Sequence, residues 1–202
     1  MRRIQACLLI ICLAVLTVCQ AAGEEVSGIR DLFQIPAATA TPAPNAFRFR
    51  DGIRWGMNTQ QVRALETTPM TEKSMAKWSI MLTDTEVTVS RFTAQLVFIF
   101  HEDRLQMISY EFKNGSAEEY QYLSGALCTV YGEKHEAEPL KIKELMDAIN
   151  PNKYITDQIK QPYGWSTEDG TSVYQYIFSQ NAFAITYVSP ELGSRIYQTN
   201  GL

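Results

Sequence analysis

The chain has 202 residues, of which 46% are hydrophobic, and its 18 Lys and Arg face 22 Asp and Glu. The formal net charge is therefore −4. Nucleic-acid binding draws its affinity from clustered cations. Because the chain is acidic and lacks a dense basic run, we expect that it does not bind nucleic acid.

The chain opens in the order of a secretory signal peptide. Arg2 and Arg3 precede an apolar run that ends at Val18, and the small residues Ala21 and Ala22 follow. The run is shorter than the ~18 residues of a spanning helix. We predict that residues 1–22 are removed after Ala21 or Ala22 and that the protein acts in the bacterial periplasm or is secreted.

Cysteine usage leaves one alternative to this location. Cys7, Cys12 and Cys19 lie in the leader, so the mature chain keeps only Cys128 and cannot form an intrachain disulfide. The run that ends in Val18 and Cys19 is close to the pattern of bacterial lipoproteins, although Val18 is bulkier than the usual Gly, Ala or Ser. Lipidation of Cys19 is the only route by which we expect membrane attachment.

Composition divides the rest of the chain. Residues 23–46 are rich in Pro, Ala and Thr and read as a flexible tether, because such a segment cannot bury enough apolar surface to fold. Residues 47–190 are predicted to form a single domain with a substantial core. Residues 191–202 carry no assignment.

The domain begins with a glycine turn and a short helix. Asn58 stands three residues before Gln61, which is the spacing of a capping box. We predict that the following helix turns one apolar face to the core. This start is interpreted as a structural latch made of Trp55, Gly56, Asn58, Gln61, Val62 and Leu65.

Strands are predicted where β-branched and aromatic residues alternate between turns. They cover residues 78–82, 87–92, 94–101, 105–112, the region of Trp165, 173–178 and 183–188. A second capping box, Ser116 with Glu119, starts a long helix that ends at Gly132. Residues 133–161 are read as an inserted segment with a helix over 140–149, and Pro190 as the end of the last element.

These elements predict an α+β fold. We expect an antiparallel sheet of about six to seven strands, with two main helices packed on one face and the inserted helical segment beside it.

Catalytic chemistry has weak support in the sequence. The only histidines are His101 and His135, each followed by acidic residues, and neither has the second histidine of a zinc helix. No nucleophile elbow, phosphate loop or dinucleotide fingerprint is present. We assign no catalytic, metal or cofactor-binding residue and expect no cofactor.

Aromatic residues give the one candidate binding face. Tyr174 and Tyr176 alternate on one predicted strand, and Tyr187 lies on the next. These tyrosines either cover the edge of the core, which we favour, or form a binding platform in which each ring offers area and a hydroxyl.

The segment Ile53-Arg-Trp-Gly-Met-Asn-Thr-Gln-Gln-Val-Arg-Ala-Leu-Glu, with the later Tyr131-Gly132 helix stop, resembles a group of exported, uncharacterised bacterial proteins. Its part from Gly56 to Val62 also resembles the helix start of BamE/SmpA-type outer-membrane assembly lipoproteins and of β-lactamase-inhibitor-like domains. The chain departs from the latter by placing strands after this helix. The resemblance implies no activity and no site residue.

Two functions remain as hypotheses. The first is an exported, non-catalytic domain that binds a protein or another component of the cell envelope. The alternative is an extracellular hydrolase that uses His101 or His135 as its acid or base.

Overall fold

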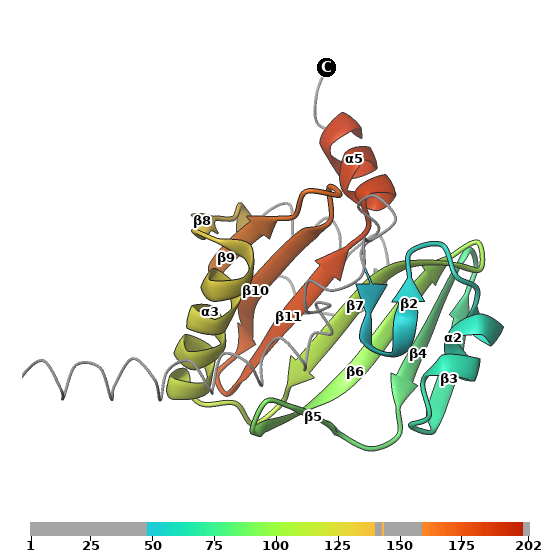
Figure 1. Ribbon diagram of the computed structural model, residues 1–202, viewed down its shortest axis with the longest axis horizontal. Coiled ribbons are helices and arrows are strands. Elements are labelled where there is room, and N and C mark those ends of the chain that lie inside the picture. The colour runs from blue at the N-terminus through green and yellow to red at the C-terminus, as the bar shows by residue number, and fades with distance from the viewer. Residues whose placement is uncertain (1–47, 140–142, 144–158, 200–202) are drawn as a thin grey trace, which may run out of the picture.

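The computed structural model describes residues 48–139, 143 and 159–199. The predicted signal peptide, the tether and most of the predicted helix over 140–149 lie outside these residues. Within them, nine strands form one antiparallel sheet in the order β3-β4-β6-β7-β11-β10-β9-β8, and β5 pairs with β6 (Figure 1). The strands are β3 (Met70–Met75), β4 (Trp78–Thr83), β5 (Val87–Val89), β6 (Phe92–His101), β7 (Arg104–Phe112), β8 (His135–Glu136), β9 (Lys160–Ser166), β10 (Ser172–Ser179) and β11 (Ala182–Val188).

Strand β6 lies inside the sheet and not at its edge. It pairs with β4, β5 and β7, and five consecutive residues, Leu96 to Phe100, are buried. Leu96 and Phe98 face one side of the sheet, which we call the inner face, while Val97 and Ile99 face the other, the outer face. Both sides of this strand are therefore removed from water.

The inner face carries the larger core. Helix α3 (Ala117–Tyr131) packs on it through Tyr120, Leu123 and Leu127. A two-stranded hairpin at the start of the domain, β1 (Arg48–Phe49), η1 (Arg50–Gly52) and β2 (Ile53–Arg54), adds Phe49 and Ile53 to the same core. The short helix α2 (Thr59–Leu65) adds Val62.

Both predicted capping boxes are confirmed. The side chain of Asn58 accepts from the backbone N–H of Gln61, and that of Ser116 accepts from Glu119. In each box the third helical residue bonds back to the cap, so two backbone donors at each helix start are satisfied. No helix among the described residues is both long and apolar enough to cross a membrane.

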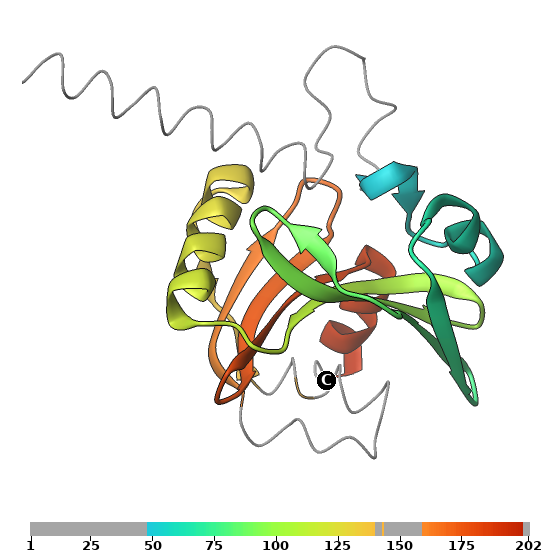
Figure 2. The same ribbon diagram turned by 90° about the horizontal axis from the view of Figure 1, so that it is seen from below.

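The predicted balance of helix and sheet is wrong. The described sheet has nine strands, and the three α-helices whose bounds lie within the described residues span only 7, 15 and 10 residues. The helices also do not share one face: α5 (Pro190–Thr199) lies on the outer face, where Leu192 packs with Val97, Ile99 and Met107 (Figure 2). Strands β3 and β8 enlarge the sheet beyond the predicted six to seven.

Helix α5 starts where the sequence predicted the last element to end. The side chain of Ser189 accepts from the backbone N–H of Leu192 (3.1 Å), so Ser189 caps the helix and Pro190 is its first residue. Proline is favoured at this position, because its missing N–H would have no partner in the helix.

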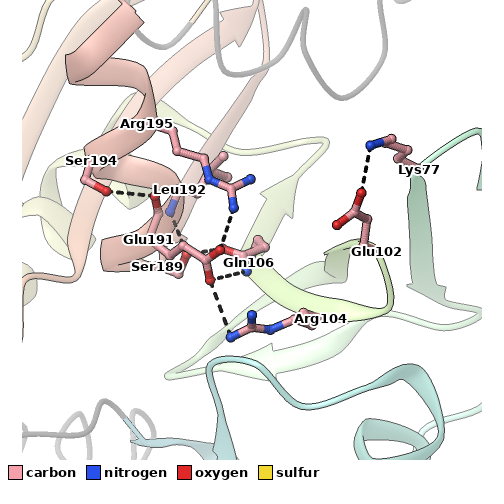
Figure 3. A network of polar contacts seen from close by, with 9 residues as sticks. All are labelled: Lys77, Glu102, Arg104, Gln106, Ser189, Glu191, Leu192, Ser194 and Arg195. Atoms are coloured by element: carbon pink, nitrogen blue, oxygen red, sulfur yellow. Dashed lines mark hydrogen bonds and ion pairs between the residues drawn. The ribbon is translucent and has the colours of Figure 1, made fainter.

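A polar network fixes this helix start to β7 (Figure 3). Glu191 accepts a hydrogen bond from the Gln106 amide (3.2 Å) and pairs with Arg104 (3.5 Å) and Arg195 (2.7 Å). The hydroxyl of Ser189 donates to Gln106. These contacts make α5 part of the domain.

Candidate functional site

The three tyrosines of the predicted binding face do not share a face. Strand β11 runs antiparallel to β10, and its register places Tyr187 opposite Val173, whereas Tyr174 lies opposite Thr186. Directly opposite residues point to the same side of a sheet. Tyr187 therefore faces the inner core, and Tyr174 and Tyr176 face outward.

On the outer face the two tyrosines differ in exposure. Tyr176 is 3% exposed and packs with Ala137 and Ala184. Its hydroxyl lies 3.3 Å from the hydroxyl of Thr186, and burial raises its pKa. Tyr174 is half-buried. Only Tyr174 thus offers ring surface to a partner.

On the inner face Tyr187 belongs to a cluster of three tyrosines. Its ring lies 6.4 Å from that of Tyr131 at the end of α3, and 6.0 Å from Phe49 of the hairpin. Phe49 also contacts Tyr110, with 5.5 Å between centroids. Burial raises the pKa of Tyr187 and Tyr110 well above the usual value, and that of Tyr131 to about 12.

A raised tyrosine pKa keeps the hydroxyl protonated, so these groups act as hydrogen-bond partners and not as bases near neutral pH. The neighbouring Tyr187 side chain lowers the pKa of Tyr131, but burial is the larger effect. The cluster is closed by the hairpin and α3, and we interpret it as a polar part of the core.

Next to this cluster lies a buried ion pair. The Glu66 carboxylate, at the end of α2, is buried, and its Oε2 lies 3.5 Å from Nε of Arg50. The other oxygen, Oε1, accepts from the backbone N–H of Thr68 (3.0 Å). Arg50 also lowers the pKa of Tyr110, against the larger effect of burial.

The predicted latch residues meet the hairpin between β6 and β7. The backbone N–H of Gly56 donates to the carbonyl of Leu105 (3.0 Å), and that of Leu105 donates to the carbonyl of Met57 (2.8 Å). Gly56 has a φ of +80°, which favours glycine. Asp103 at the hairpin tip accepts from the backbone N–H and the hydroxyl of Thr59, at 3.0 and 3.1 Å.

The side chains of the latch differ in burial. Val62 is fully buried, whereas Trp55 and Leu65 are half-buried at the border of the inner core. The indole N–H of Trp55 donates to the hydroxyl of Thr171 (2.9 Å), the residue directly before β10. Asn58 and Gln61 stay near the surface as the cap.

The two histidines lie far apart in the sheet. His101 ends β6 and packs against Trp78, with 4.6 Å between ring centroids. His135 lies in the edge strand β8, and four strands, β7, β11, β10 and β9, separate it from β6. They do not form one acid and base pair, so a hydrolase would have to use one of them without the other. No group of three or more His, Cys, Asp or Glu among the described residues could hold a metal ion.

Strand β3 forms the opposite edge of the sheet. Its four central residues, Thr71 to Ser74, are exposed, and no described strand pairs with its free edge. The sequence did not predict this strand, because Thr-Glu-Lys-Ser has no alternation of apolar and polar residues. The short polar run between Pro69 and the turn at Ala76 could have indicated an edge strand, since edge strands often carry charged side chains.

Comparison with protein-family models, with curated protein sequences and with solved structures finds no match to this chain. The resemblance at the Trp-Gly-Met segment therefore stays a prediction.

Proposed function

We propose that this protein is an exported, non-catalytic domain that binds another protein of the envelope or the secreted fraction through the edge of strand β3. The observation that supports this function is the edge strand β3, whose residues Thr71 to Ser74 are exposed and whose free edge pairs with no described strand. A partner strand that adds to such an edge gains main-chain hydrogen bonds without any rearrangement of the sheet. The export itself rests on the leader sequence.

The directions of the backbone groups on β3 follow from its register. The N–H of Asp84 donates to the carbonyl of Pro69 (2.8 Å), one position beyond the pair of Met70 with Thr83. Pro69 and Asp84 therefore form a hydrogen-bonded pair. Since hydrogen-bonded and non-hydrogen-bonded pairs alternate in an antiparallel ladder, the backbone groups of Thr71 and Lys73 bond to β4. The N–H and C=O groups of Met70, Glu72 and Ser74 then point away from the sheet.

One contact agrees with this direction. The guanidinium of Arg63 on α2 donates to the carbonyl of Met70 (3.0 Å), which is one of the outward groups. The same guanidinium pairs with the carboxylate of Glu72 (3.1 Å). Arg63 thus occupies the first part of the edge, and the backbone groups of Glu72 and Ser74 remain available to a partner.

Affinity capture with the exported protein tests the function. Ser74→Pro removes an outward N–H without breaking a bond to β4, whereas Ser74→Ala keeps that N–H and is the matched control. Proline is tolerated where the N–H of an edge strand faces solvent. We expect the same partner to be recovered by the unchanged protein and by Ser74→Ala, and to be lost with Ser74→Pro.

Stability measurements should accompany the capture, and both variants should unfold within about 0.5 kcal/mol of the unchanged protein. Recovery of the partner by all three proteins would exclude β3 as the binding edge. Recovery of no partner from envelope or secreted fractions would contradict the binding function.

A further inference from the structure

The two charges on β3 do not have the same surroundings. Glu72 points to the inner face and is paired with Arg63. Lys73 points to the outer face, since it lies opposite Ile80, which in turn lies opposite Ile99. No carboxylate of the described residues forms an ion pair with Lys73. The edge therefore presents one uncompensated positive charge.

Two copies of β3 would pair poorly with each other. Only Met70, Glu72 and Ser74 present outward backbone groups, so an antiparallel pair must align these residues with one another. The two registers that align most of the strand place Glu72 opposite Glu72 of the second copy, or Lys73 opposite Lys73. Like charges directly opposite each other destabilise a pair of strands. This edge therefore favours a different partner over a second copy of the chain.

A heterologous strand would meet Lys73 at close range. Because Lys73 bonds to β4, the residue opposite it in an antiparallel partner forms a non-hydrogen-bonded pair, in which side chains approach most closely. An acidic residue at that place would gain a cross-strand ion pair. Glu72 already has Arg63 as an ion-pair partner at 3.1 Å, so a cation of the partner would add less there.

The neighbouring residues define the rest of the partner. On the outer face, Met75 and the half-buried Trp78, Ile80 and Leu82 border Lys73, so an apolar residue opposite Met75 would extend this surface. On the inner face, Ser74 and Glu72 favour small polar residues. Resting on the proposed function, we propose that β3 binds antiparallel to an extended segment that carries an acidic residue opposite Lys73.

Peptide titration followed by NMR tests this proposal on the ¹⁵N-labelled protein purified after export. The probe is the acetylated and amidated peptide Val-Thr-Glu-Thr-Val-Val, whose third residue would lie opposite Lys73. Its counterpart is Val-Thr-Lys-Thr-Val-Val. We expect the backbone amide signals of Glu72 and Ser74 to shift, and the Lys peptide to bind about fivefold more weakly than the Glu peptide.

The variant Lys73→Glu should reverse this preference. Methylation of the backbone nitrogen of the fourth peptide residue, which would donate to the Glu72 carbonyl, should abolish binding. Methylation at the third residue, whose N–H points away from β3, should leave binding unchanged and is the matched control.

The outcomes separate the two proposals. If both peptides bind equally to the unchanged protein and to Lys73→Glu, the acidic partner is excluded while strand addition stands. If neither peptide shifts the Glu72 and Ser74 signals at millimolar concentration, both proposals are contradicted. Sensitivity to methylation at the third residue instead of the fourth would exclude the antiparallel register.

Discussion

At the scale of single residues, the contact between Arg50 and Glu66 joins the first turn of the domain to the end of α2. The carboxylate is buried, while the Arg50 side chain keeps 26% of its surface exposed. Removing one partner of such a pair leaves a charge in the interior without compensation, which costs more than the pair itself contributes.

We therefore expect Arg50→Met to lower the free energy of unfolding by about 2 kcal/mol, below the range for fully buried pairs because Arg50 is partly exposed. The double variant Arg50→Met with Glu66→Gln should recover much of this loss. Denaturant unfolding of both single variants and the double variant completes the cycle. Additive losses would show that the two side chains do not interact.

Trp55 tests the latch at the same scale. Its half-buried ring borders the inner core, so Trp55→Ala should cost about 2 to 3 kcal/mol, less than the roughly 3 to 5 kcal/mol typical of a fully buried aromatic residue. Trp55→Phe keeps most of the ring and loses the bond to Thr171, at a cost of about 1 kcal/mol. A negligible change in denaturant unfolding for Trp55→Ala would place the ring on the surface.

At the scale of elements, two glycines lie so close to neighbouring side chains that a larger residue would not fit without a shift. A Cβ on Gly115, between β7 and α3, would overlap the ring of Phe183 and lie 3.3 Å from Cβ of Phe112. A Cβ on Gly164 in β9 would lie 2.7 Å from Nε2 of His135. The Phe183 ring is buried, whereas His135 is exposed and can move.

Gly115→Ala should therefore lower the free energy of unfolding by about 1 to 3 kcal/mol, as overpacked cores do. Gly164→Ala should cost less, and adding His135→Ala should remove the part of that cost that comes from the clash with the His135 ring. Denaturant unfolding of the three proteins measures the contrast. Equal losses for the two glycine variants would mean that the backbone at Gly115 shifts freely.

The elements also differ in how well sequence predicts them. The helix starts at Asn58 and Ser116 were predictable, because a capping box is read within four residues. The outer position of Tyr174 and the inner position of Tyr187 were not, since a shift of one residue between β10 and β11 would exchange their faces. The start of α5 was not predictable either, because a proline such as Pro190 can end one element or start a helix. Strand β3 was missed because it lacks the apolar alternation that marks a half-buried strand.

At the scale of the whole molecule, five tyrosines share one electrostatic property. Burial raises the pKa of Tyr110, Tyr120, Tyr131, Tyr176 and Tyr187 above the ordinary value of 10.0. The folded chain therefore holds protons that the unfolded chain releases above pH 10. By linkage, stability is fully present below pH 10 and is lost as pH rises through the folded-state values.

We expect the melting temperature to be insensitive to these groups up to about pH 9 and to fall steeply beyond pH 10, with each such tyrosine removing about 1.4 kcal/mol per pH unit. Tyr131→Phe should make the fall between pH 10 and 12 shallower. Thermal unfolding monitored by circular dichroism across this range provides the measurement. A constant melting temperature up to pH 12 would show that the tyrosines ionise in the folded protein.

The bond between Trp55 and Thr171 also bears on the order in which the chain can fold. It joins residues 116 positions apart, and Phe49 reaches still further to Tyr187. Contacts of such separation must close a long loop before they stabilise anything, which slows folding. During synthesis the first hairpin emerges long before β10 and β11. Phe49 of the hairpin therefore cannot reach its core partner Tyr187 until nearly the whole chain is made. The chain therefore cannot complete its core until late in its synthesis.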